Sequence, residues 1–187
     1  MRRGFKAEAK RLALELRAEL GLDADCPFDP YAFADEYGIR VVRLSELDGP
    51  GRDYFLKRDG SALSGALIPI VTGVAILEND AQPDVRRRTT MSHELAHVVL
   101  EHEFGVSLAD ERKCGLGGAQ EEEADWLSGE LLIPYDGALR LARANATDAD
   151  AAGAFQVSLA VARWRMNHSG ARTVVERTRS KWNGARR

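Results

Sequence analysis

The pentapeptide His-Glu-Leu-Ala-His at residues 93–97 constrains this chain more than any other stretch of it. On an α-helix, residues four positions apart lie about 40° apart around the axis and one turn along it, so His93 and His97 project from the same face. Two imidazoles in this arrangement can bind one metal ion. Glu94 lies on the adjacent face, where its carboxylate can reach a water on a bound zinc ion and accept its proton. The pattern therefore predicts a helix that carries a catalytic zinc site of a hydrolase.

The residues around the motif favour a helix over about residues 84–103. Pro83 or Asp84 can begin this helix. Leu95 and Val98 are apolar and can anchor it in a core. A metal site needs such an anchor, because its ligands have to be held within tenths of an ångström of their positions.

A catalytic zinc ion usually takes three ligands from the protein, and a second helix over residues 121–134 can supply the third. Acidic residues in its first turn are favoured by the helix dipole, and Pro134 marks its end. Glu121 and Asp125 share one face of this helix. Glu121 can therefore bind the ion, while Asp125 accepts a hydrogen bond from the far nitrogen of a histidine ligand. Without the histidine pair, three successive glutamates would be interpreted as a solvated helix start.

Residues 86–97 read Arg-Arg-Arg-Thr-Thr-Met-Ser-His-Glu-Leu-Ala-His, and residues 121–134 read Glu-Glu-Glu-Ala-Asp-Trp-Leu-Ser-Gly-Glu-Leu-Leu-Ile-Pro. These segments resemble the ImmA/IrrE family of metallopeptidases. That family carries the patterns Arg-x-x-x-Thr-x-x-His-Glu-x-x-His and Glu-x-x-Ala-(Asn/Asp)-x-Phe-Ala-x-x-Leu-Leu-x-Pro. The chain departs from these patterns at residues 91–92 and 127–128, where the changes affect packing and leave the chemistry untouched.

Much of the remaining chain shares the resemblance. Residues 29–42 resemble the opening helix and first strand of the family, and residues 63–68 and 74–80 resemble the hairpin before its catalytic helix. Residues 157–167 resemble a later segment in which the family carries a helix-turn-helix-like element.

The resemblance implies that His93, His97 and one glutamate of the second helix bind the metal, and that Glu94 is catalytic. The spacing of the family pattern selects Glu121 as the third ligand. A shift in the start of the helix would bring Glu122 forward instead, and this alternative stays open.

The resemblance also implies a zinc-dependent endopeptidase of the gluzincin-like class, with Zn2+ as the cofactor and Mn2+ able to take its place. Its expected protein substrate is a DNA-binding repressor of helix-turn-helix type, cleaved in a stress response or in the induction of a mobile element. His102 is typical of the family as well. On a continuous helix it lies about 180° around the axis from His93, so we expect a hydrogen-bonded histidine rather than a ligand.

The order of predicted elements indicates an α+β fold with a zincin-like core, in which a small, mainly antiparallel sheet packs on the two metal helices. We expect helices over residues 5–20, 30–38, 84–103 and 121–134, and strands over residues 39–44, 53–58, 63–70 and 73–78.

Three parts of the chain have separate expected roles. Residues 1–136 are expected to form the zincin-like peptidase domain. Residues 137–170 are expected to form a helical, helix-turn-helix-like segment that packs on this domain. Residues 171–187 are expected to form a basic, flexible tail.

The basic end of the chain raises the question of nucleic acid. Residues 163–187 contain eight Lys or Arg against one acid, a net charge of +7, which leaves −10 for residues 1–162 because the whole chain carries −3. This end can touch phosphates or an acidic protein surface. We expect instead that this end packs on the peptidase, because a single helix-turn-helix-like element in a monomer lacks the second recognition element that paired DNA half-sites usually require for specificity.

Composition favours a cytoplasmic enzyme of modest size. The 187 residues suit one domain, or one with a small appendage. Two cysteines, Cys26 and Cys114, do not make a disulfide framework, and no segment resembles a signal peptide or a membrane span. We expect both to be free thiols, although Cys114 follows the catalytic helix closely enough for a redox role over the zinc to be considered.

Two other functions remain open from the sequence. In one, the protein is a regulator that grips DNA or a repressor without cutting it, with the zinc ion in a structural role. In the other, it is a toxin-like partner that a small antitoxin repressor neutralises.

Overall fold

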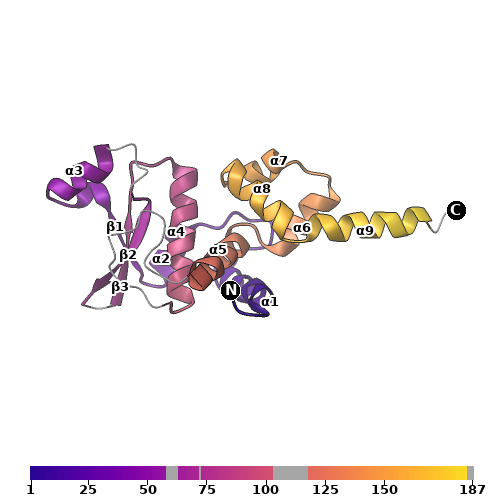
Figure 1. The fold of residues 1–187 in the computed structure, drawn as a ribbon, viewed down its shortest axis with the longest axis horizontal. Coiled ribbons are helices and arrows are strands. Elements are labelled where there is room, and N and C mark those ends of the chain that lie inside the picture. Colours follow the sequence, from indigo (N-terminus) through magenta and orange to yellow (C-terminus); the bar gives the residue numbers. More distant parts are fainter. Residues whose placement is uncertain (58–62, 72, 103–117, 185–187) are drawn as a thin grey trace. The chain divides into compact units, whose positions relative to one another are not determined.

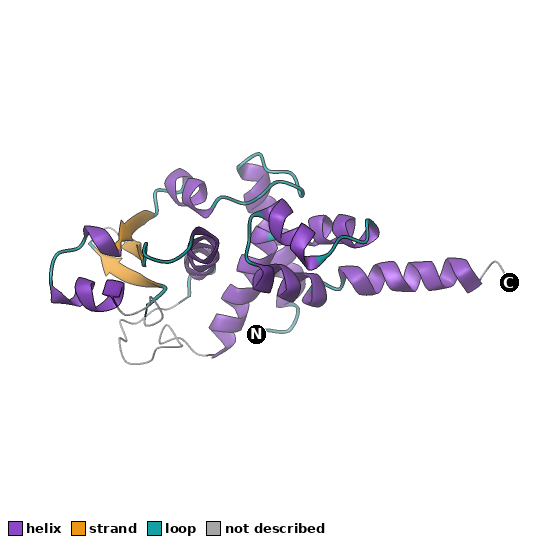
Figure 2. Ribbon diagram, turned by 90° about the horizontal axis from the view of Figure 1, so that it is seen from above, coloured by secondary structure: helices purple, strands orange, loops and turns teal. Residues whose placement is uncertain are grey.

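The computed structural model describes residues 1–57, 63–71, 73–102 and 118–184, and it has a mixed α+β fold that is mostly helical (Figure 1). The expected α+β class is confirmed. The chain divides into two compact units, one made of residues 1–9 and 29–128 and the other of residues 10–28 and 129–187. The described strands all belong to the first unit (Figure 2). That residues 1–136 act as a separate peptidase domain stays a prediction.

The sheet of the first unit consists of β1 (Arg40–Arg43), β2 (Gly65–Ile70) and β3 (Gly73–Glu78), in the order β1-β3-β2. β2 and β3 pair antiparallel, but β1 and β3 pair parallel. The expectation of a mainly antiparallel sheet is therefore wrong for one of its two pairings. Apolar alternation shows where strands lie without showing their direction, and here other elements stand between β1 and β3 and return the chain in the same sense.

The segment between β1 and β2 contains a short 3-10 helix, η1 (Leu44–Glu46), and helix α3 (Pro50–Lys57). The strand expected over residues 53–58 is thus wrong for its described part. A proline at the first position of α3 and Asp53 in its first turn both favour a helix, because proline is tolerated there and the carboxylate interacts well with the helix dipole. Tyr54 and Phe55 are residue types with high strand propensity, but propensity is a weak guide to the observed structure here.

Two helices pack together beside the sheet: α2 (Pro30–Glu36) and α4 (Asp84–Val99), and α4 also contacts β2 and β3 (Figure 1). The side chain of Asp29 caps α2 by accepting a hydrogen bond of 2.9 Å from the backbone N–H of Tyr31. On α4, Met91 and Leu95 lie one turn apart and are completely buried. Burial of each contributes roughly 1.5–3 kcal/mol, which holds α4 firmly in the core.

Helices α1 (Phe5–Glu19) and α5 (Gly118–Leu132) run close to their expected positions. At the carboxyl end of α5, two buried arginines donate hydrogen bonds to backbone carbonyl groups that lack helical partners. Arg17 donates to the carbonyl of Leu131 at 2.7 Å, and Arg165 donates from Nε to the carbonyl of Ile133 at 2.8 Å while pairing with Glu130. Cations at this end also interact favourably with the helix dipole, so both arginines stabilise the helix that carries the expected third ligand.

The second unit also contains α6 (Tyr135–Arg143), α7 (Asp148–Phe155) and α8 (Leu159–His168). A reciprocal capping box of Thr147 and Asp150 begins α7, and the side chain of Ser158 caps α8. These caps satisfy backbone N–H groups of the first turn and so fix where both helices begin.

The final helix, α9 (Ala171–Gly184), occupies residues for which a flexible tail was expected. Ala171 and Val175 lie one turn apart and are buried, and α9 packs on α6 and α8. The basic composition of this segment concealed a short apolar stripe, so the flexible tail is wrong for residues 171–184.

Within the described ranges, no helix is both long enough and apolar enough to cross a membrane. Cys26 is a half-buried free thiol, whereas Cys114 lies outside the described residues.

Candidate metal centre

Two helices of the first unit bring three potential metal ligands together. α4 contributes His93 and His97, and the first turn of α5 contributes Glu121. One ligand atom from each of these residues lies within 4.8 Å of the others. The two histidines are neighbours because they stand one turn apart, with their Nε2 atoms 3.0 Å from each other.

The spacing of these atoms suits a zinc-sized ion. Ligand atoms about 2.05 Å from a tetrahedral ion lie about 3.3 Å apart. His93 Nε2 lies 3.3 Å from Oε2 of Glu121, and His97 Nε2 lies 3.5 Å from its Oε1. Within the described part of the chain, this Oε1 is buried and makes no hydrogen bond, which leaves its lone pairs available for an ion. Two imidazoles and a carboxylate are also donors that zinc accepts readily.

Asp125 lies where a support for His93 is needed. Its Oδ1 is 3.0 Å from His93 Nδ1, so this ring can donate its N–H to the carboxylate and direct the lone pair of Nε2 toward the ion. Glu122, the alternative third ligand, has a side chain that is 66% exposed and does not belong to the cluster.

The charges of the cluster favour a cation. Burial disfavours the charged form of His93, but the hydrogen bonds that its ring donates to Asp125 and Glu121 and the charge of Glu94 outweigh this effect and raise the pKa of His93 to about 10. Burial likewise opposes the charge of Glu121, yet the two histidines lower the pKa of this carboxyl to about 2. A metal ion would replace the positive charge that His93 otherwise carries as a proton.

His102 contacts the cluster in a way that helical periodicity did not predict. The expected helix to residue 103 ends at Val99, and Glu101 adopts a left-handed conformation with φ of 52°. The chain therefore turns back, and His102 Nδ1 lies 2.9 Å from Nδ1 of His97. Burial and the neighbouring His97 lower the pKa of His102, which favours its neutral ring.

Glu94 is buried, with 3% of its surface exposed, and it faces the start of β2. A Cβ atom added to Gly65 would lie 3.5 Å from Cγ of Glu94 and 2.6 Å from Cγ2 of Thr90. β2 therefore lies so close to α4 beside Glu94 that a residue larger than glycine would overlap with the side chain of Thr90. Sequence patterns do not reveal such a contact between distant segments, so Gly65 was missed.

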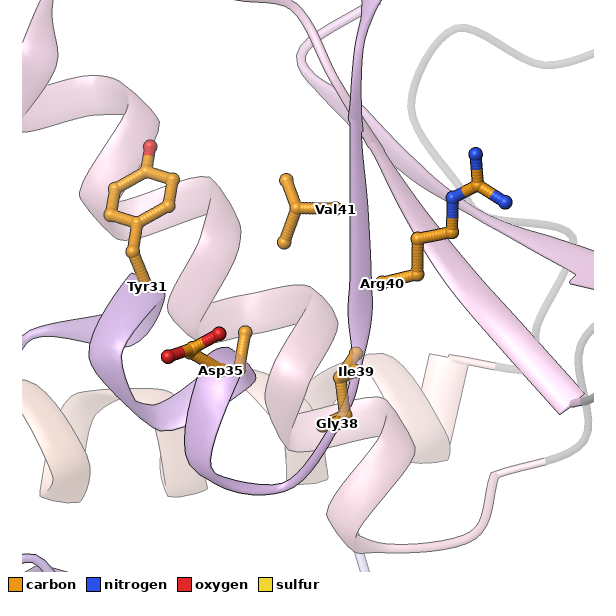
Figure 3. A pocket seen from close by; sticks show the side chains of 7 residues that line it. Tyr31, Asp35, Gly38, Ile39, Arg40 and Val41 are labelled. Atoms are coloured by element: carbon orange, nitrogen blue, oxygen red, sulfur yellow. The ribbon is translucent and has the colours of Figure 1, made fainter.

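A separate open pocket of about 410 Å³ lies between α2 and β1 (Figure 3). Tyr31 and Asp35 line its helical side, and Arg40 and Val41 belong to the strand. No member of the metal cluster lines this pocket, so it does not form the metal site.

Comparison with known proteins gives one family. The model of a peptidase family, described as the IrrE N-terminal-like domain, matches residues 34–167. This match spans more than two thirds of the chain and includes both helices of the cluster. No curated protein matches the chain.

Proposed function

The chain belongs to the IrrE N-terminal-like peptidase family, and from this premise we propose that it is a zinc-dependent endopeptidase of the gluzincin-like, zincin-type class. The observation that carries the proposal is the donor set of His93, His97 and Glu121, which offers one ligand atom from each residue within 4.8 Å of the others, close enough for one zinc ion. Mn2+, which accepts the same nitrogen and oxygen donors, can take the place of Zn2+.

Glu94 is the proposed catalytic residue. Zinc, when bound, supplies a Lewis acid that activates water and polarises the peptide carbonyl. The carboxylate of Glu94 accepts a proton from the attacking water and then donates it to the nitrogen of the leaving amine. Asp125 holds the ring of His93 in the orientation that directs Nε2 to the ion.

The proposed substrate is a helix-turn-helix transcriptional repressor, cleaved in the cytoplasm as part of a stress response or a mobile-element switch. Resemblance to the ImmA/IrrE family supports this substrate class. The consecutive helices α7 and α8 have the outline of a helix-turn-helix element, which is also a feature of that family.

The test of the enzymatic role is the substitution Glu94→Gln. The variant should bind zinc as the unaltered protein does, because Glu94 is not a ligand, and should cleave the repressor encoded beside it at least about 100-fold more slowly. Glu122→Gln is the matched control, since it removes an exposed carboxylate from the other helix and should cleave normally. Cleavage by Glu94→Gln at a near-normal rate would remove Glu94 from the mechanism.

The non-proteolytic alternatives are less well supported. Three arginines of the basic end already have partners within the second unit: Arg163 and Arg172 pair with Asp148, and Arg179 donates to Asn145. A regulator with a structural zinc ion, or a toxin-like partner, would bind the same repressor and leave it intact. Gel analysis of the zinc-loaded protein after incubation with that repressor separates these outcomes from proteolysis.

A further inference from the structure

The turn after α4 buries His102 against a proposed metal ligand. The backbone N–H of His102 donates to the carbonyl of His97 at 3.0 Å, and the two Nδ1 atoms are 2.9 Å apart. Both side chains are buried. Two ring nitrogens at this distance form a hydrogen bond only when one carries a proton and the other does not.

The metal site decides which ring carries that proton. If His97 presents the lone pair of Nε2 to the ion, its proton has to lie on Nδ1. His97 Nδ1–H then donates to His102, whose Nδ1 accepts. The remaining proton of a neutral His102 must lie on its Nε2.

Glu123 favours this same tautomer of His102. Its Oε2 lies 3.7 Å from His102 Nε2, too far for a good hydrogen bond, but the negative carboxylate attracts a proton on the nitrogen that faces it. Arg2 holds the carboxylate in place: its backbone N–H donates at 2.7 Å, and its Nε donates at 3.1 Å, both to Oε1. The side chain of Glu123 is only 6% exposed, so water screens this charge weakly.

We propose that His102 is a positioning residue of the metal centre, which holds His97 in the tautomer that binds the ion and is itself oriented by the Arg2–Glu123 pair. This role rests on the proposed function, because it presumes that His97 binds a metal. With this role for His102, each of the two histidine ligands has a hydrogen-bonding partner at its Nδ1. Asp125 supports His93 at Nδ1, and His102 supports His97 at Nδ1, so that both Nε2 atoms converge on one point.

Two substitutions at residue 102 separate orientation from packing. His102→Leu removes the acceptor but keeps an apolar side chain in the buried position. His102→Asn keeps an acceptor, because the amide oxygen of asparagine can occupy the place of Nδ1. Zinc affinity is measured by competition with a chromophoric chelator, on purified protein whose folding is checked by circular dichroism.

The expected result is graded. His102→Leu should weaken zinc binding about 10- to 100-fold, as loss of a support behind a ligand usually does, whereas His102→Asn should stay within about 3-fold of the unaltered protein. His168→Leu removes an exposed histidine from α8 and should change nothing. Equal zinc affinity of His102→Leu and the unaltered protein would overturn the proposal, and so would an equal loss in the Leu and Asn variants.

A second measurement does not depend on any variant. Long-range 1H–15N correlation spectra of the zinc-loaded protein report which nitrogen of each histidine carries the proton. We expect a proton on Nδ1 of His97 and on Nε2 of His102, and a proton on Nδ1 of His102 would overturn the proposal. Failure of the unaltered protein to bind zinc at all would instead overturn the proposed function, and with it the premise of this role.

Discussion

Substitution of Gly65 by alanine should force β2 away from the helix that carries Glu94. The added Cβ would lie 2.6 Å from Cγ2 of Thr90 and 3.3 Å from the carbonyl oxygen of Leu77. Carbon atoms in good contact are about 3.5–4.0 Å apart, so the methyl groups of residues 65 and 90 would overlap by roughly 1 Å. Threonine has few side-chain rotamers on a helix, and a simple rotation of Thr90 therefore offers limited relief.

The expected cost follows from two opposing effects. Overpacking of this kind costs about 1–3 kcal/mol of unfolding free energy. Replacement of glycine by alanine returns about 0.4–1 kcal/mol, because the unfolded chain loses freedom and the φ of Gly65 is not in the left-handed region. We expect Gly65→Ala to be destabilised by about 1–2 kcal/mol, in the range that these two effects leave.

A substitution at Thr90, the residue that the added methyl group would overlap, supplies the control. Thr90→Ser removes Cγ2 and should cost at most about 0.8 kcal/mol, the value of one buried methyl group. In Gly65→Ala combined with Thr90→Ser, the overlap no longer exists and only the effect on the unfolded chain remains, so the double variant should be about 0.4–1 kcal/mol more stable than Thr90→Ser alone.

The assay is urea unfolding of the metal-free protein, followed by circular dichroism, for the unaltered chain, both single variants and the double variant. A favourable coupling energy of about 1–3 kcal/mol is expected from this cycle. Cleavage of the repressor should fall in Gly65→Ala and recover in the double variant. Additive losses would show that the close contact with Thr90 is not the reason for a glycine at this position.

Three other outcomes are expected. In the metal-free protein, the stability that His93 contributes is complete below its ordinary pKa of 6.5 and is lost as the pH rises toward about 10. The stability that Glu121 contributes is complete above its ordinary pKa of 4.5 and is lost as the pH falls toward about 2. The advantage in melting temperature over His93→Gln should therefore shrink between pH 6.5 and 10, and a constant difference would contradict the charge assignment. Free zinc at 100 times its dissociation constant should stabilise the protein by about 2.7 kcal/mol, reversibly with a chelator, and no shift would count against a metal site. Gly137→Ala should destabilise the protein by at least about 1–3 kcal/mol, because its Cβ would lie 2.4 Å from the carbonyl oxygen of Ala24. Gly153→Ala, which has open space around it in α7, should stabilise the protein by about 0.5–1 kcal/mol. Melting curves that rank the two variants the other way would refute this reasoning.

Short-range periodicity explains the features that could be predicted from the sequence. Because a helix repeats every 3.6 residues, the spacing of His93 and His97 was enough to place both on one face of α4, and that of Glu121 and Asp125 was enough on α5. The start of α2 was predictable for a similar reason, since a capping residue such as Asp29 acts within one turn of itself.

Only the tertiary structure decided how these faces meet. Strand direction, the helical state of residues 50–57 and the burial of α9 depend on packing between segments that are distant in sequence, which local propensity does not record. Two details next to the site have the same origin. His102 reaches His97 because α4 ends at Val99 and the chain turns back, and a glycine suits position 65 because β2 packs closely on α4 at Thr90. The sequence by itself determined which donors a metal ion would find, and the tertiary structure determined what holds those donors in position.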